Sequence, residues 1–185
     1  MRSLGLILAL VVTLAVPVPA SAELRINDLD VYLNDHEVTV HVVALGTLAD
    51  GLHEGLQSGV PAHVRFTVEL WQYSRFWRDR LVTTKVVERA LDYNVVTKEY
   101  KVAVVRGESR APYVTRDLRD AQRLLSELRG LKLVPAAELP SAEIFYVRVL
   151  AESALRGENT FVTRMNGTAA QTLRQSDYRT IVRSE

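Results

Sequence analysis

Several stretches of the chain alternate apolar and polar side chains with a period of two, which is typical of strands that bury one face. In the clearest of them, every second residue from Val64 to Leu70 is apolar. Asn34, Asp35 and His36 predict a turn between the first two strands, and a second turn is predicted within residues 92–98. The predicted strands cover residues 24–33, 37–45, 64–70, 81–91, 100–104 and 144–150.

A different spacing predicts one long helix over about residues 115–129. Thr115 is a candidate N-cap, and Gly130 suits the left-handed conformation that often follows a helix. Apolar residues recur there every three or four positions and form one stripe. The stripe comprises Leu118, Ala121, Leu124, Leu125 and Leu128. We expect it to pack on a sheet, and the alternative is a face that binds a partner.

A shorter helix is predicted at about residues 50–58, with Asp50 as N-cap and Gly59 as its end. Short strands separated by turns, with one packed helix, indicate a mainly β domain. We predict an antiparallel two-sheet β-sandwich-like domain, and a partly closed barrel is the alternative. Periodicity is weak after about residue 155, where we expect a less regular part with one more hairpin and an extended end.

The first residues of the chain have the three parts of a secretory signal peptide. Arg2 gives a positive start, residues 4–16 are uncharged and apolar, and Ala20, Ser21 and Ala22 form a small-residue cleavage site. We therefore expect cleavage after Ala22, a single domain over residues 23–185, and a secreted, periplasmic location. The alternative is a retained anchor, which needs about 20 apolar residues. Because the chain has no cysteine, a lipid on an N-terminal cysteine is excluded.

Composition narrows the class of protein further. Cleavage would remove 22 of the 185 residues and leave 163, enough for a packed core without disulfides. The chain has 23 basic and 22 acidic residues, and loss of Arg2 would leave 22 of each. Nucleic-acid-binding proteins usually carry a basic excess, so we expect no nucleic-acid partner. No stretch after the signal is apolar enough to be a transmembrane segment.

Motifs for catalysis are not evident. The four histidines, His36, His41, His53 and His63, lack the close spacing that metal sites favour, and no G-x-S-x-G or phosphate-binding loop is present. We therefore predict no catalytic, cofactor-binding or metal-binding residues, although histidines distant in sequence can still meet in space.

The most unusual segment is rich in aromatic residues and arginine. Tryptophan, tyrosine and arginine dominate binding hot spots, while aromatic residues at strand ends more often cover a sheet edge. Both roles stay open for this segment. The candidate partner-binding residues are Trp71, Tyr73, Arg75, Phe76, Trp77 and Arg78.

The order of several short motifs resembles a bacterial exported family known as domain of unknown function 4390. The segment Gly51–Pro61 precedes the alternating strand, and Phe76-Trp77-Arg78-Asp79-Arg80 follows it. A hairpin with Thr97-Lys98-Glu99-Tyr100 and a strand with Tyr146-Val147-Arg148 continue the pattern. The resemblance covers most of residues 24–183 and is loosest after residue 155. It implies export in Gram-negative-type bacteria and brings no catalytic residues.

These observations favour a non-catalytic periplasmic binding or accessory module of the cell envelope, with another envelope protein as its partner and no cofactor. One alternative is an envelope hydrolase with an active site built from loops. A second is a homo-oligomeric structural component that pairs through exposed strand edges. The sequence leaves the oligomeric state open.

Overall fold

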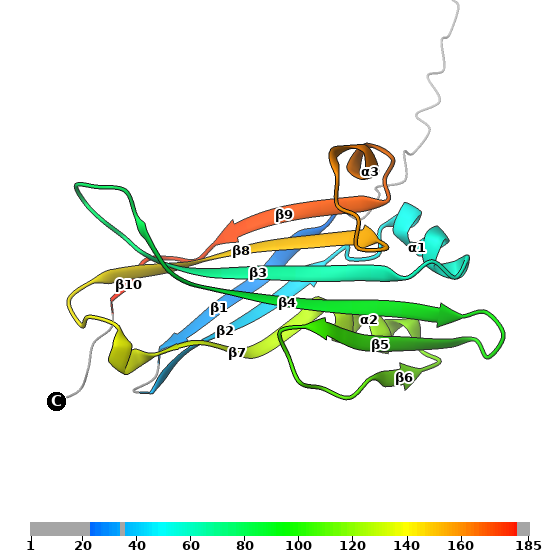
Figure 1. The fold of residues 1–185 in the computed structure, drawn as a ribbon, viewed down its shortest axis with the longest axis horizontal. Coiled ribbons are helices and arrows are strands. Elements are labelled where there is room, and N and C mark those ends of the chain that lie inside the picture. The colour runs from blue at the N-terminus through cyan, green and yellow to red at the C-terminus, as the bar shows by residue number, and fades with distance from the viewer. Residues whose placement is uncertain (1–22, 34–35, 181–185) are drawn as a thin grey trace, which may run out of the picture.

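The computed structural model describes residues 23–33 and 36–180, and most of these residues are in strands (Figure 1). The predicted signal peptide, Asn34 and Asp35 lie outside the described residues. The strands are β1 (Arg25–Leu33), β2 (Glu37–Leu45), β3 (Ala62–Gln72), β4 (Arg80–Asn94), β5 (Glu99–Arg106), β6 (Tyr113–Thr115), β7 (Glu127–Pro135), β8 (Ile144–Leu155), β9 (Ala169–Gln175) and β10 (Arg179–Thr180). The helices are α1 (Asp50–Gln57), α2 (Leu118–Ser126), the 3₁₀ helix η1 (Ala136–Glu138) and α3 (Phe161–Met165).

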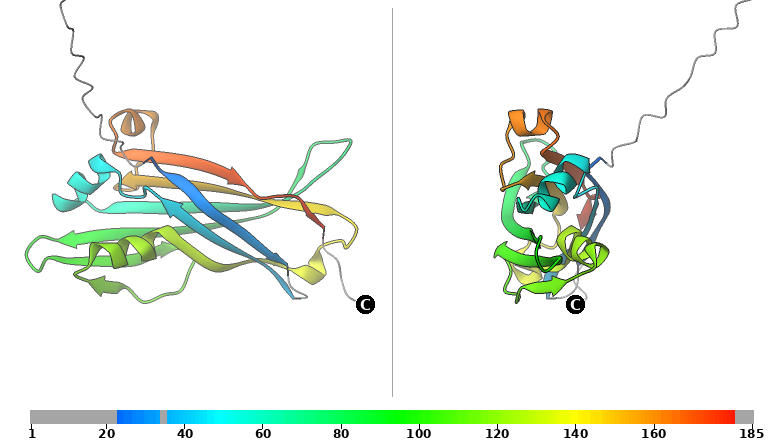
Figure 2. Two further views of the ribbon diagram at one scale, coloured as in Figure 1. Left: turned by 180° about the vertical axis from the view of Figure 1, so that it is seen from behind. Right: turned by 90° about the vertical axis from the view of Figure 1, so that its right-hand side faces the viewer.

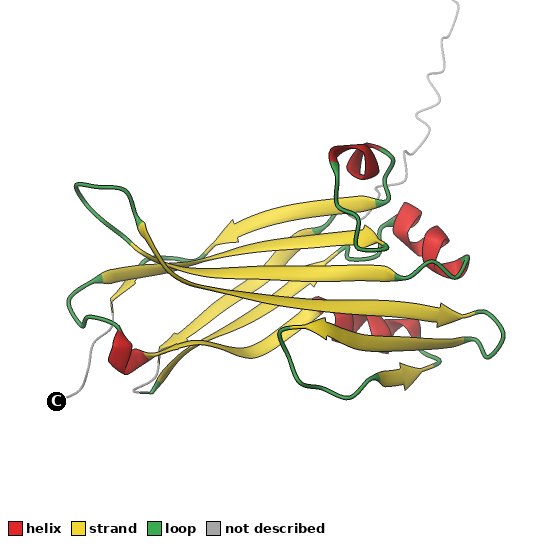
Figure 3. Ribbon diagram, in the orientation of Figure 1, coloured by secondary structure: helices red, strands yellow, loops and turns green. Residues whose placement is uncertain are grey.

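The strands form two antiparallel sheets. The smaller sheet has the order β1-β2-β7, and the larger has the order β10-β8-β3-β4-β5-β6, with β9 also paired to β8. Among the described residues no strand pairs across from one sheet to the other. The strands of the smaller sheet run diagonally behind those of the larger one (Figures 1 and 3), and Figure 2 shows the two layers from the side. The predicted two-sheet sandwich is confirmed, and within the described residues the two sheets do not close into a barrel.

The core lies between the sheets and follows directly from the alternating pattern. Every second side chain of β3 from Ala62 to Leu70 is buried, and so is every second side chain of β2 from Val38 to Ala44. These side chains belong to one hydrophobic cluster. Complete burial of a valine, leucine or phenylalanine side chain contributes about 1.5–3 kcal/mol. These inward-facing side chains therefore contribute strongly to the stability of the fold.

The short helix α1 forms where it is predicted, over residues 50–57. Its N-cap is Ala49 rather than Asp50, and no side chain caps it. Asp50 instead lies in the first turn, where a negative charge interacts favourably with the helix dipole. Leu52 and Leu56 are fully buried, and Gly59, with φ +82°, ends the helical segment. The helix thereby closes one end of the core.

The long helix is present but shorter than the predicted range 115–129. Thr115 belongs to β6, and the N-cap is Asp117, whose side chain accepts a 2.8 Å hydrogen bond from the backbone N–H of Arg119. At Glu127 the chain continues directly as β7, and Gly130, with φ +61°, lies within that strand. Pairing with β2 supplies backbone hydrogen bonds along an otherwise open edge, and this outweighs local helical preference.

The apolar stripe of the predicted helix is therefore divided between two elements. Ala121 and Leu125 of α2 are fully buried, whereas Leu118 and Leu124 are half-buried against the same core. Leu128 is fully buried on β7, opposite Val42 of β2. The helix does pack on the sheets, as predicted, but Leu125 rather than Leu124 lies at the centre of the contact.

The residues after Leu155 extend the larger sheet. Helix α3 stands on a projecting connection, and β9 then returns along β8 as an antiparallel neighbour (Figure 1). Arg174 of β9 donates hydrogen bonds to the carbonyl groups of Ile26 (3.0 Å) and Asn27 in β1. No helix within the described residues is long and apolar enough to cross a membrane.

Candidate functional site

The loop between β3 and β4 projects beyond the two sheets at one end of the molecule (Figure 1 and Figure 2). The last residue pair of the hairpin is Gln72 with Arg80, and the Arg80 guanidinium donates to Oε1 of Gln72 at 3.0 and 2.7 Å. Residues 73–79 form the connection, which we call the tip loop. A side-chain bond at its base thus holds the two strands together before the chain turns.

Hydrogen bonds within the tip loop hold its backbone in place. Asp79 Oδ1 accepts from the backbone N–H of Ser74 at 3.0 Å, and Ser74 Oγ accepts from the backbone N–H of Trp77 at 3.2 Å. The second oxygen of Asp79 accepts from the Tyr146 hydroxyl at 2.8 Å. These bonds connect both ends of the loop to each other and to β8. The loop is therefore structured without any bound partner.

Burial raises the pKa of Tyr146 to about 12, and the hydrogen bond to Asp79 adds to this effect. The Tyr146 hydroxyl consequently stays protonated at neutral pH and remains a donor. Asp79 is the only acidic residue of the tip loop, and both of its oxygens are occupied by contacts within the protein. The Asp79 carboxylate therefore stabilises the fold of the loop.

Aromatic side chains form a packed base beneath the loop on the outer face of the larger sheet. Trp71 stacks on Tyr146 with ring centroids 6.5 Å apart, and the Arg148 guanidinium lies 5.4 Å from the Trp71 ring. Tyr178 contacts both Tyr73, at 5.1 Å, and Tyr146, at 5.3 Å, in edge-to-face geometry. Trp71 and Tyr73, two of the predicted partner-binding residues, therefore have structural contacts.

The other four predicted residues lie at the exposed end of the loop. The Phe76 side chain is 84% exposed and the Trp77 side chain 86% exposed. Arg75 and Arg78 are also exposed, and the Arg75 guanidinium lies 5.7 Å from the Phe76 ring. The structure thus separates the predicted set into a packed base and a free tip. The binding role of the tip remains a prediction.

The four histidines lie on or next to three different elements, and His53 and His63 contact polar side chains. His53 of α1 contacts Gln57 at 2.8 Å, His41 is half-buried on β2, and His36 is exposed just before that strand. His63 lies within β3 rather than before it, and its Nδ1 is 3.1 Å from Glu88 Oε1. Across residues 23–33 and 36–180, no three His, Asp or Glu side chains are placed to hold a metal ion.

Glu88 is the centre of a polar network on the outer face of the larger sheet. Burial raises the pKa of its carboxyl group, but hydrogen bonds and charges from Arg65 and His63 together outweigh burial and lower that pKa. The Arg65 side chain donates to Glu88 at 3.0 Å and lies 4.0 Å from Glu152. A carboxylate kept ionised in this way fits a structural ion pair better than a general acid.

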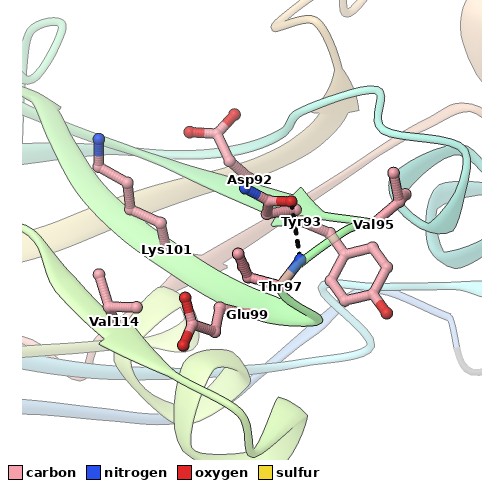
Figure 4. Close-up of a pocket in the computed structure, with 8 residues that line it drawn as sticks. Asp92, Tyr93, Val95, Thr97, Glu99, Lys101 and Val114 are labelled. Carbon is pink, nitrogen blue, oxygen red and sulfur yellow. Dashed lines mark hydrogen bonds between the residues drawn. The ribbon is translucent and has the colours of Figure 1, made fainter.

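A shallow depression of about 520 Å³ lies over β4 and β5 near their connecting turn (Figure 4). The Asn94 side chain accepts from the backbone N–H groups of Val96 and Thr97 and so stabilises the turn. Asp92 and Lys101 occupy paired positions on the two strands, and Glu99 forms an ion pair with Arg116 at 3.3 Å. Two of the polar side chains that line the depression, those of Asn94 and Glu99, therefore have partners within the protein.

The alternation in β4 leaves one charged residue inside the core. Arg89 shares the inward face of β4 with Val87 and Leu91, and its side chain is 2% exposed. Its guanidinium forms three hydrogen bonds of 2.7–3.1 Å with the Glu108 carboxylate and donates to the carbonyl groups of Leu124 and Glu127. Arg89 therefore holds the junction of α2 and β7 against β4, which is a structural role.

Comparison with known proteins agrees with the order of motifs in the sequence. No curated protein and no solved structure is significantly similar to the chain. One family model, described as a domain of unknown function, matches residues 21–155, from the end of the predicted signal peptide to the end of β8. The match covers the tip loop, its packed base up to Tyr146, and both sheets apart from β9 and β10. The chain therefore belongs to the domain-of-unknown-function family DUF4390.

Proposed function

We propose that the protein is a non-catalytic binding module of the bacterial cell envelope and that the tip loop is its binding surface. The observation that carries the proposal is the near-complete exposure of Phe76 and Trp77, at 84% and 86%. Burial of large aromatic side chains away from water is favourable, and exposed apolar groups that cluster together mark interaction sites.

The chemistry of the tip supports binding rather than catalysis. The side chains of Phe76 and Trp77 cannot act as acids or bases, and the guanidinium groups of Arg75 and Arg78 are hydrogen-bond donors without an acceptor. Planar rings and arginines are, in contrast, the residue types that dominate binding energy. The loop is also held by the bonds of Ser74 and Asp79 before any partner arrives, and such order lowers the entropic cost of binding.

Placement in the envelope rests on the sequence of residues 1–22. The positive start, the apolar stretch and the small residues before Glu23 are what a signal peptidase requires. Intact-mass measurement of the protein from a periplasmic fraction tests this part of the proposal. We expect a mature chain that begins at Glu23, and a stable form that retains residues 1–22 would contradict export with cleavage.

Site-specific photocrosslinking tests the binding surface. A photoreactive phenylalanine analogue is introduced at position 77 or, as a control, at position 96, in the bacterium that produces the protein. Val96 is a matched control because it is also 86% exposed and lies in the β4–β5 turn, at the opposite end of the molecule (Figure 1). We expect crosslinked products from position 77 that the Phe76→Ser substitution diminishes. Equal products from both positions, or none from position 77, would contradict the proposal.

A further inference from the structure

We propose that the tip loop inserts into the surface of a lipid bilayer that contains anionic lipids. This inference rests on the proposed function and names the partner of the same surface. It replaces a protein partner, which the sequence led us to expect, because the shape and charge of the tip fit a lipid surface better.

The apolar part of the tip suits the boundary between headgroups and acyl chains. Phe76 and Trp77 are adjacent residues at the end of a projecting hairpin, and both are almost fully exposed. Tryptophan is enriched at membrane–water interfaces, because its ring is apolar while its N–H can bond to headgroups or water. Phenylalanine beside it supplies apolar area without a polar group that needs a partner in the acyl region.

The charge of the tip is complementary to an anionic surface. The tip loop contains Arg75 and Arg78 against Asp79 alone, a formal charge of +1, and Arg80 at its base adds one more positive charge. Asp79 is directed into the protein by its bonds to Ser74 and Tyr146. Arg75 and Arg78 flank Phe76 and Trp77 in the sequence and are exposed, so they place positive charge beside the two rings, where it can attract anionic lipid headgroups.

The shape of the hairpin allows the rings to reach a flat surface. The loop extends past the ends of the sheets in the view from behind (Figure 2, left), so the rings can meet a bilayer before the sheets do. A protein partner would have to supply a pocket for a convex tip, whereas a bilayer accommodates it by parting its headgroups. The packed base of Trp71, Tyr73, Tyr146 and Tyr178 keeps the loop in place during insertion.

Fluorescence of Trp77 reports insertion directly, since the chain contains only two tryptophans. Trp71→Phe leaves Trp77 as the sole reporter. The probe is a suspension of phosphatidylcholine vesicles with or without one third phosphatidylglycerol. We expect a blue shift of Trp77 emission, and quenching by lipids brominated on the acyl chain, with the anionic vesicles. Cosedimentation of the unsubstituted protein with the same vesicles is a second measurement that does not depend on the Trp71→Phe substitution.

Three variants separate the contribution of the apolar ring to vesicle binding from that of the two arginine charges. Phe76→Ser should weaken partitioning about ten-fold, the equivalent of about 1.4 kcal/mol from partial burial of one ring. Arg75→Gln and Arg78→Gln should each weaken it about five-fold, and only with the anionic vesicles, which corresponds to about 1 kcal/mol per charge. Phe161→Ser is the matched control, because Phe161 is also exposed, at 68%, but lies on α3 at the other end of the larger sheet. It should change nothing.

The inference is overturned if the unsubstituted protein does not cosediment with anionic vesicles, or if Phe161→Ser reduces partitioning as much as Phe76→Ser does. The experiments also distinguish failure of this inference from failure of the proposed function. Crosslinks from position 77 to a protein, without vesicle binding, would retain the binding surface and remove the lipid. Absence of both would remove the binding surface itself.

Discussion

Removal of the Glu108 carboxylate leaves the Arg89 guanidinium inside the protein without its anionic partner. The Arg89 side chain is 2% exposed and that of Glu108 19% exposed. Loss of one member of a buried ion pair destabilises a protein by about 3–5 kcal/mol. Because Glu108 is partly accessible, water can occupy part of the space it leaves. We therefore expect Glu108→Ala to lower the free energy of unfolding by about 3 kcal/mol, the lower end of that range.

Substitution of the other partner, Arg89, should destabilise the protein by a similar amount but for a different reason. Arg89→Met retains an apolar stem of similar length, and Glu108 can then turn toward solvent. The carbonyl groups of Leu124 and Glu127, however, lose their donor, and each unsatisfied buried group costs about 1–3 kcal/mol. In the double variant the Glu108→Ala substitution no longer leaves a buried charge. The double variant should therefore lose less free energy of unfolding than the sum of the losses of the two single variants, by about 2 kcal/mol.

Urea unfolding followed by circular dichroism measures these differences for the unsubstituted protein, the two single variants and the double variant. The comparison holds when the dependence of the unfolding free energy on urea concentration is the same in all four. Glu99→Ala is the control, because the ion pair of Glu99 with Arg116 lies at the surface, with 35% and 78% of the side chains exposed. Exposed pairs contribute about 0–1 kcal/mol. A loss for Glu108→Ala no larger than that for Glu99→Ala, or a double variant equal to the sum of the single ones, would refute the reasoning.

Three further predictions concern the core, the Tyr146 hydroxyl and the turn after β5. Leu125→Ala should lower the free energy of unfolding by about 2–5 kcal/mol and the half-buried Leu124→Ala by less, and equal urea midpoints would contradict the burial described for α2. Because the pKa of Tyr146 is raised to about 12, the unfolded chain loses this proton first, near pH 10. Stability should then fall as pH rises from about 10 to 12, and less steeply in Tyr146→Phe. Gly107→Ala should cost about 2 kcal/mol or more, because φ is +88° and the added Cβ would lie 2.0 Å from the Val86 carbonyl oxygen. An unchanged melting temperature would contradict that geometry.

The strands were predictable because their burial follows a local rule. From Val64 to Leu70 each side chain faces the core or the outer surface according to its parity, and the structure reproduces this pattern. The same parity placed Trp71 and Tyr73 on the outer face. It also marks Arg89 as inward-facing between Val87 and Leu91, a signal that sequence reasoning missed.

Features that depend on contacts distant in sequence were not predictable. The spacing of Leu128 with Leu124 and Leu125 fits a helix, and only the free edge of β2 explains why the chain becomes a strand at Glu127. Likewise, nothing near Trp71 indicates that Tyr146 will stack on it. The sequence therefore singled out the aromatic segment around the tip loop as a candidate, but it could not separate the packed base from the exposed end.

Shielding of Trp77 by native envelope membranes tests the central claim most directly, whether the partner is a lipid or a protein. The measurement compares acrylamide quenching of the single tryptophan in Trp71→Phe with that in Trp71→Phe/Trp77→Phe/Val96→Trp, before and after envelope vesicles from the producing bacterium are added. If the tip loop is the binding surface, the vesicles should protect the tryptophan at position 77 from acrylamide and leave the one at position 96 accessible. Unchanged quenching at position 77, or equal protection at the two positions, would contradict the account.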